Sequence, residues 1–172
     1  MHPIKDQLVD SSRMIADMVT AYIGDDQDKF DEIIEIMQKD QYPMAMRAAR
    51  VAYFVSLKHP VLIRKHISNL IGMLSASKID GIKRGVLKIM ADTTIRIEDD
   101  ELGELTELAF TFVQDAREKI AVRALSIEVL ERIIRYYPEL KPEFIAVLES
   151  MPSDISVALK GKCKKVLKRL KK

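Results

Sequence analysis

The chain has 172 residues, of which 48% are hydrophobic and 31% are charged, a balance typical of a globular domain that excludes a disordered or low-complexity protein. Its 28 basic and 26 acidic residues leave a net charge of +2, so the overall charge indicates no particular partner. The single cysteine, Cys163, excludes an internal disulfide and a cysteine-rich zinc site. We find no secretory signal pattern and no apolar run near the roughly 20 residues that span a bilayer, so we expect a cytoplasmic protein without a transmembrane segment.

Apolar residues recur at three- and four-residue spacing along almost the whole chain, which predicts helices and not strands. The first stripe runs from Leu8 to Tyr22 and ends at Gly24, the expected glycine cap. The other stripes are Phe30–Met37, Met46–Leu57, Ile63–Leu74, Ile82–Met90, Leu105–Phe112, Val122–Ile133, Phe144–Leu148 and Leu159–Leu170. These nine segments, joined by short links, leave no room for a sheet.

Polar residues predict where several of these helices begin. Two acidic blocks, residues 25–28 and 98–101, stand directly before apolar stripes, where carboxylates bond free backbone N–H groups and oppose the positive end of the helix dipole. The first block lacks the glycine and the twelfth-position glutamate of an EF-hand loop, so we favour helix starts over a metal site. Ser77, with Asp80 three residues on, is expected to begin the fifth helix, and Ser153 is expected to cap the ninth.

An internal repeat becomes visible when alternate helices are aligned. In four segments an apolar residue is followed by a basic one, and two further apolar residues come seven and eight positions after the first. The basic residues of this column, separated by 36, 40 and 37 positions, are Arg47, Lys83, Arg123 and Lys160. The intervening helices recur at 37, 38 and 37 positions through Ile34, Ile71, Ala109 and Ala146. This period predicts four pairs of helices.

The pattern resembles the HEAT-like, or armadillo-like, α-solenoid family, whose repeats are helix pairs with a hydrophobic–Arg dipeptide and small residues at the start of the second helix. Val122-Arg123-Ala124 is the closest match, and Met46-Arg47-Ala48-Ala49 is the next. The resemblance covers roughly residues 27–172. It implies an all-α, right-handed solenoid that forms a single domain over residues 1–172. The expected parts are an N-terminal capping helix or half-repeat at residues 4–23 and helix pairs at residues 27–58, 60–94, 99–136 and 141–171.

Stacked repeats share one apolar interior, and a terminal repeat needs a polar outer side. Val51, Leu87 and Ile127 occupy one repeat position, and Lys164 replaces them in the last repeat, as expected for a cap.

In this class the second helices line the concave side. Two columns are expected to face outward there, Ala52, Lys88, Glu128 and Lys165 and, one turn on, Ser56, Asp92, Arg132 and Arg169. Neither column is uniformly basic, whereas a groove for a nucleic-acid backbone should keep one sign, so this argues against nucleic acid.

Three features allow either a functional or a structural interpretation. The basic column could bind a ligand, but we favour a structural role in which its members bond loop carbonyls or carboxylates between repeats. The eight basic residues at positions 160–172 could bind nucleic acid or an anionic membrane, and we favour a solvated capping helix with cations at the negative end of its dipole. Gly81 and Gly85, spaced four apart, predict close helix packing.

Catalytic signals are weak. His2, His59 and His66 have no cysteine or glutamate at metal-ligand spacing, and we find no catalytic motif or phosphate-binding glycine-rich loop. Cys163 lies in an apolar stripe, which predicts a buried, inert thiol. We therefore expect no enzymatic activity, no cofactor and no metal site.

The function that the sequence favours is a scaffold that binds a protein or peptide on the concave face of the solenoid. The alternative is nucleic-acid binding through a middle patch, formed by Arg50, Arg84 and Lys88, and the C-terminal lysines. The candidate binding residues are Arg50, Arg84, Lys88, Arg132, Lys165, Lys168 and Arg169. The sequence leaves the partner and the oligomeric state open.

Overall fold

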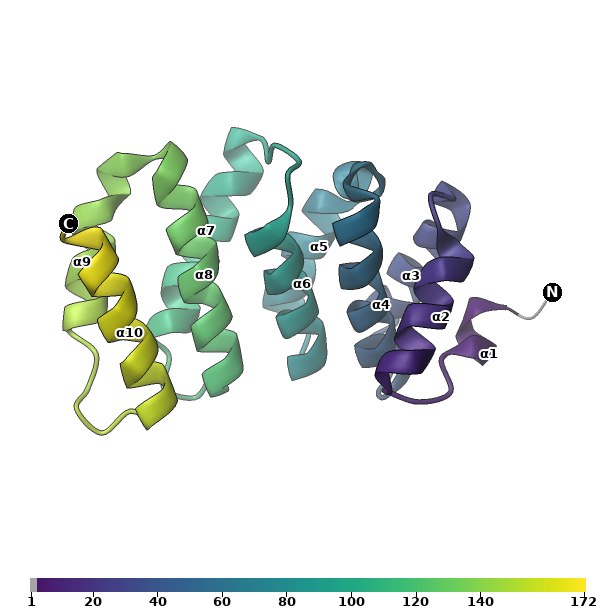
Figure 1. Cartoon of the computed structure of the whole chain (residues 1–172), viewed down its shortest axis with the longest axis horizontal. Coiled ribbons are helices and arrows are strands. Elements are labelled where there is room, and N and C mark those ends of the chain that lie inside the picture. The colour runs from purple at the N-terminus through teal and green to yellow at the C-terminus, as the bar shows by residue number, and fades with distance from the viewer. Residues whose placement is uncertain (1–2) are drawn as a thin grey trace. The chain divides into compact units, whose positions relative to one another are not determined.

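A computed structural model describes residues 3–172, which form ten α-helices and two short 3-10 helices without a strand (Figure 1). The predicted all-α class is therefore confirmed. The helices fall into two compact units, Met1–Leu102 and Gly103–Lys172. That residues 1–172 form a single domain stays a prediction.

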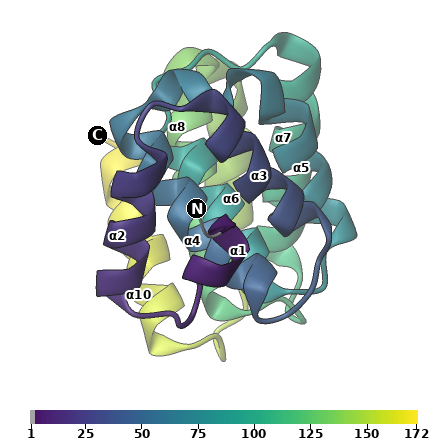
Figure 2. The ribbon, with the colours of Figure 1, turned by 90° about the vertical axis from the view of Figure 1, so that its right-hand side faces the viewer.

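The first unit is a stack of paired helices. Its elements are α1 (Ile4–Gln7), α2 (Arg13–Ile23), α3 (Gln27–Gln38), α4 (Met44–Lys58), η1 (Pro60–His66), α5 (Ile67–Ala76) and α6 (Asp80–Asp92). Helix α2 packs on α4 and α4 packs on α6, forming one layer, while α1 packs on α3 and α3 on η1 in a second layer. The end view separates these layers, with α2 on one side and α3 and α5 on the other (Figure 2). Helix α4 thus contacts its pair, α3, and the helices of the repeats on either side, as expected for this class.

The N-terminal segment, predicted as a capping helix or half-repeat at residues 4–23, contains two helices, α1 and α2. The Ser12 side chain accepts a hydrogen bond from the Ile15 backbone N–H at 3.2 Å, so a new helix begins there. The single turn of α1 is held against α3 by a bond from the Ile4 N–H to Glu32. Gly24 ends α2 with a φ of +56°, which confirms the predicted glycine cap.

Other predicted helix starts have mixed outcomes. Asp26 caps α3 through the Lys29 N–H, as expected of the first acidic block. Ser77 does not cap α6: its Oγ accepts the Ile79 N–H, two residues on, which makes a turn before the helix begins at Asp80.

Two later predictions concern α7 and α10. The second acidic block does begin a helix, because α7 starts at Asp99. The N-cap of α10 is Ser156, which accepts the Leu159 N–H at 3.3 Å, and not Ser153, which lies in the turn before it.

Helices α4 and α6 pack closely because glycines face α4. A Cβ on Gly85 would lie 2.8 Å from the Ala49 Cβ and 2.9 Å from the Ala49 carbonyl oxygen. A Cβ on Gly81 would lie 2.2 Å from Met46 Cγ. The prediction that these glycines permit close packing is therefore confirmed. Ala49 and Gly85 occupy the same repeat position, so one repeat stacks on the next in register.

The second unit contains most of α7 (Asp99–Gln114), followed by α8 (Ile120–Tyr136), η2 (Pro138–Leu140), α9 (Lys141–Glu149) and α10 (Val157–Leu170). Helix α10 packs on both α8 and α9. Phe144 of α9 is fully buried and meets Phe110 of α7 edge to face, with 6.2 Å between ring centroids. Lys164 is exposed on α10, whereas Val51, Leu87 and Ile127 at the same repeat position are buried, as the repeat predicted.

Candidate functional site

The basic column of the repeat has a structural role at three of its four positions. Arg47 Nη1 donates to the Leu8 carbonyl at 2.8 Å, Arg123 Nε to the Val113 carbonyl at 3.0 Å, and Lys160 Nζ to the Ser153 carbonyl at 3.4 Å. Arg123 is only 6% exposed, so no ligand reaches it without rearrangement. The Arg47 bond joins neighbouring repeats, as the favoured interpretation expects, whereas the bonds of Arg123 and Lys160 lie within one repeat, so a role between repeats stays a prediction for those two residues.

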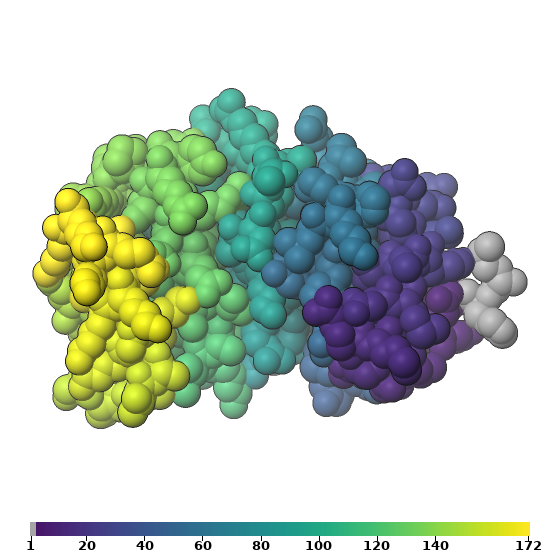
Figure 3. All heavy atoms as spheres, in the orientation of Figure 1, coloured from purple at the N-terminus to yellow at the C-terminus, as the bar shows by residue number. Residues whose placement is uncertain are grey.

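Three of the seven predicted binding residues line one pocket of about 580 Å³ in the first unit. They are Arg50 of α4 with Arg84 and Lys88 of α6. Arg13 of α2 and Arg47 of α4 add two further cations. Figure 3 shows the face of the molecule on which α2 (purple), α4 (blue) and α6 (teal) lie.

Helical spacing explains why these side chains converge. On α4, the lining residues Met46, Arg50, Tyr53 and Phe54 recur at four, seven and eight positions, which places them on one face. On α6, Gly81, Gly85 and Lys88 recur at four and seven positions. The glycines carry no side chain, so they leave room between the longer residues.

Aromatic rings hold the cations of the pocket in place. The Arg13 guanidinium carbon lies 4.3 Å from the Phe54 ring centroid, and that of Arg50 lies 5.8 Å from it. Lys88 Nζ lies 5.3 Å from the Tyr53 ring. Such cation–π contacts are favourable by about 0.5–1 kcal/mol each at exposed sites. The two rings also contact each other, with 5.5 Å between centroids.

Positive charge in the pocket is partly compensated. Arg13 forms a salt bridge with Asp17 at 2.9 Å and the charge of Arg47 acts on the Asp10 carboxylate, so the pocket cations without a carboxylate partner within residues 3–172 are Arg50, Arg84 and Lys88. Arg50 Nη1 donates to the Ser11 carbonyl at 2.6 Å, and the other N–H groups of Arg50 form no hydrogen bond within residues 3–172. Arg47 Nε is buried and has no hydrogen-bond partner in the described part of the chain. Arg84 is exposed, so its positive charge is accessible at the pocket.

The other four predicted residues lie in the second unit. Arg169 Nη2 pairs with Glu131 at 2.6 Å, and Arg132 of α8 is half-buried. Lys165 and Lys168 are exposed on α10. They are not part of the pocket of the first unit.

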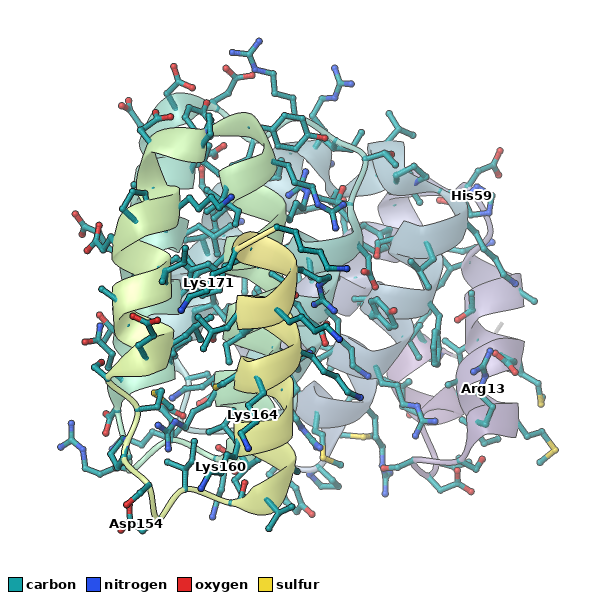
Figure 4. All side chains as sticks on the ribbon, turned by 60° about the vertical axis from the view of Figure 1, so that its left-hand side comes forward. Arg13, His59, Asp154, Lys160, Lys164 and Lys171 are labelled. Carbon is teal, nitrogen blue, oxygen red and sulfur yellow. The ribbon has the colours of Figure 1, made fainter. Side chains whose placement is uncertain are left out.

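Part of the basic C-terminal helix is neutralised by carboxylates. Lys162 pairs with Glu128, and Lys171 pairs with Glu149. Figure 4 shows Lys160 and Lys164 along α10 and Lys171 near its C-terminal end. The helix therefore combines packing contacts with an exposed row of lysines.

The predicted outward-facing columns are wrong at their first members. Ala52 and Ser56 are buried, because α4 lies between α2 and α6 and is covered over a wide arc. Arg13 was not predicted as a binding residue, because residues 4–23 were not aligned with the repeats that begin at residue 27. Tyr53 and Phe54 were assigned to the apolar stripe, yet both are half-buried and line the pocket.

A second polar cluster joins α3 to η1. His66 Nε2 lies 2.6 Å from Asp31 Oδ1, and Lys65 Nζ lies 2.5 Å from the other carboxylate oxygen. Burial opposes ionisation of Asp31, but hydrogen bonds from Lys65, Gln27 and His66 outweigh it and lower its pKa to about 2. The cluster is tied into the interior of the repeat, which is typical of a structural ion pair.

The structure also bears on the groups that could be reactive, the Cys163 thiol and possible metal ligands. Burial raises the pKa of the Cys163 thiol, which keeps it protonated and supports the predicted inert role. Among residues 3–172 we find no group of three His, Cys, Asp or Glu side chains placed to hold a metal ion, and His2 lies outside that range. No helix in the same range is long and apolar enough to cross a membrane.

Comparison with protein families identifies the class of this repeat. The model of a HEAT repeat domain matches residues 5–170. The chain belongs to the HEAT repeat family. HEAT repeats form α-solenoid scaffolds that often mediate protein interactions, and the stacked pairs described above are of this class. Neither the curated proteins nor the solved structures yield a match to this HEAT repeat chain.

Proposed function

We propose that this HEAT repeat protein is a non-enzymatic scaffold that binds a short acidic segment of a partner protein in the pocket of the first unit. The observation that carries the proposal is the convergence of five cations from α2, α4 and α6, of which only Arg13 forms a salt bridge within residues 3–172. Side-chain carboxylates of a peptide would supply the missing charge as bidentate bonds to arginine. A cytoplasmic location stays part of this proposal.

The pocket suits a peptide better than a nucleic acid. Single strands bind by stacking bases on open aromatic rings, but here cations already lie against Phe54 and Tyr53. A duplex backbone needs a long surface of one sign, whereas Asp17 and Asp92, both exposed, lie on the helices that form the pocket. The volume of about 580 Å³ is typical of a pocket for a few side chains.

The composition of the pocket also supports a non-enzymatic role. Its lining contains no histidine, cysteine or carboxylate that could act as a general base or nucleophile. Its polar atoms are chiefly N–H donors, which bind anions and do not accept protons.

Fluorescence polarisation with a labelled oligoglutamate peptide tests the proposal. Replacing Arg84 with glutamate reverses one charge in the pocket without removing a bond seen in the structure, so we expect affinity to fall at least about tenfold. The matched control is Lys164→Glu, the same kind of charge reversal on exposed α10, which should change affinity less than about twofold. Equal losses in both variants, or no binding to the wild type, would contradict the proposal.

A second candidate function rests on the exposed lysines of α10. Lys160, Lys164 and Lys168 are spaced four residues apart, so they form a row along one side of the helix. None has a carboxylate partner within residues 3–172. Such a row could bind the phosphates of a nucleic acid, in which case affinity for an oligonucleotide would fall steeply with salt and would be lost in Lys164→Glu but not in Arg84→Glu.

A further inference from the structure

We infer that the group bound by the pocket is a phosphoryl group on a side chain of the partner, so that the acidic segment is recognised in its phosphorylated form. This inference rests on the proposed function, because it names the chemistry of the ligand for the same pocket. It follows from the type of cation, the number of free donors and the way in which the cations are held.

The cations that line the pocket are mostly arginine and not lysine. Four of its five cations are arginine, although arginine makes up only 11 of the 28 basic residues of the chain. The contrast with α10, where lysine predominates, is clear. A guanidinium is a planar fork with five N–H donors that matches the oxygens of a phosphate, whereas an ammonium is a compact and strongly hydrated charge.

The free donors exceed what one carboxylate can accept. Arg47 and Arg50 each give one Nη1 donor to a backbone carbonyl, which leaves their Nη2 groups without a partner among residues 3–172. Arg84 has no bond to any of residues 3–172, so its whole fork is available. A carboxylate offers two oxygens and one charge, while a phosphoryl group offers three oxygens and a charge of about −1.5 to −2.

Two of the pocket cations already contact neighbouring groups in the protein without a ligand. The Arg50 guanidinium donates to the Ser11 carbonyl and its central carbon lies 5.8 Å from the Phe54 ring centroid, while Lys88 Nζ lies 5.3 Å from that of Tyr53. Side chains that are already ordered lose less entropy when a ligand binds. A compact group that contacts several ordered cations at once gains most from this arrangement, and a phosphoryl group is such a ligand.

Three versions of one acidic peptide test this inference on the full chain. They carry serine, glutamate or phosphoserine at one central position, and affinity is measured by isothermal titration calorimetry. We expect the phosphoserine peptide to bind at least about tenfold more tightly than the glutamate peptide. Arg84→Lys keeps the charge but removes the fork, so it should reduce this preference several-fold, while Arg64→Lys, the same substitution at an exposed residue outside the pocket, should leave it unchanged.

Each outcome separates the inference from the function on which it rests. Equal affinities for the glutamate and phosphoserine peptides would overturn phosphoryl recognition and leave the acidic-segment proposal standing. No binding of any of the three peptides would overturn both. Competition by inorganic phosphate at millimolar concentration would support a pocket that reads the phosphoryl group itself. Tighter binding of a single-stranded oligonucleotide than of the phosphopeptide, lost in Arg84→Glu, would overturn the inference in favour of a nucleic acid.

Discussion

Replacement of Gly85 by alanine tests the close stacking of α4 and α6, on which the pocket depends. The new methyl group would lie 2.8 Å from the Ala49 Cβ and 2.9 Å from the Ala49 carbonyl oxygen. Real Cβ atoms do not approach this closely, and the obstacle is backbone and not the end of a flexible side chain. The two helices must therefore move apart.

The expected change in the free energy of unfolding of Gly85→Ala follows from two opposing effects. Alanine is better than glycine in a helix interior by about 1 kcal/mol, whereas overpacking of a tight interface costs about 1–3 kcal/mol. Because the contact involves backbone atoms, we expect the upper part of this range and a net loss of about 1–2 kcal/mol in the free energy of unfolding.

Gly72→Ala provides the matched control in the same unit. Gly72 lies within α5, and a Cβ built there meets no atom within 4 Å. This variant should keep the helix propensity gain and become more stable by up to about 1 kcal/mol. Urea unfolding followed by far-UV circular dichroism measures both variants. A Gly85→Ala protein as stable as the wild type, or as stable as Gly72→Ala, would refute the close stacking.

Four further substitutions test three other contacts of the structure. Arg123→Met fills a similar volume but leaves the buried Val113 carbonyl without its donor, so unfolding should become easier by about 1–3 kcal/mol; an unchanged urea midpoint would contradict the buried bond. Asp31 has a pKa of about 2 against an ordinary value of 3.8, so its ionised form stabilises the fold above about pH 4, and this contribution, on the order of 1–2 kcal/mol, is lost as pH falls through 2. Thermal unfolding at several pH values should show that the midpoint temperature falls less between pH 4 and pH 2 in Asp31→Asn than in the wild type. Equal falls in both proteins would rule out this role of Asp31. Ser156→Ala should cost about 1 kcal/mol and Ser153→Ala much less, and the reverse order in urea titrations would place the cap of α10 at Ser153.

Much of the helical framework could be predicted from the sequence because its period is strong. The aligned segments place Ala49 and Gly85 at the same repeat position, and the structure stacks them directly. The split between α1 and α2 could not be predicted from apolar spacing, since Leu8 continues the stripe while the local bond of Ser12 decides where the helix begins. A side-chain cap can end one helix and begin another through only a few hydrogen bonds, and the spacing of apolar residues does not reveal such bonds.

The pocket was predicted only in part for a related reason. Arg50, Arg84 and Lys88 are charged residues on one side of two repeats, so their proximity follows from the repeat register. Tyr53 and Phe54 also fit an apolar stripe, and spacing alone does not separate a fully buried face from a half-buried one.

The most direct test of the central claim is a nuclear magnetic resonance titration of the 15N-labelled chain with the oligoglutamate peptide. If the pocket binds the acidic segment, the amide signals that change will be those of α2, α4 and α6 around the pocket, including Arg50, Arg84 and Lys88. Changes confined to α10, around Lys164 and Lys168, would contradict it.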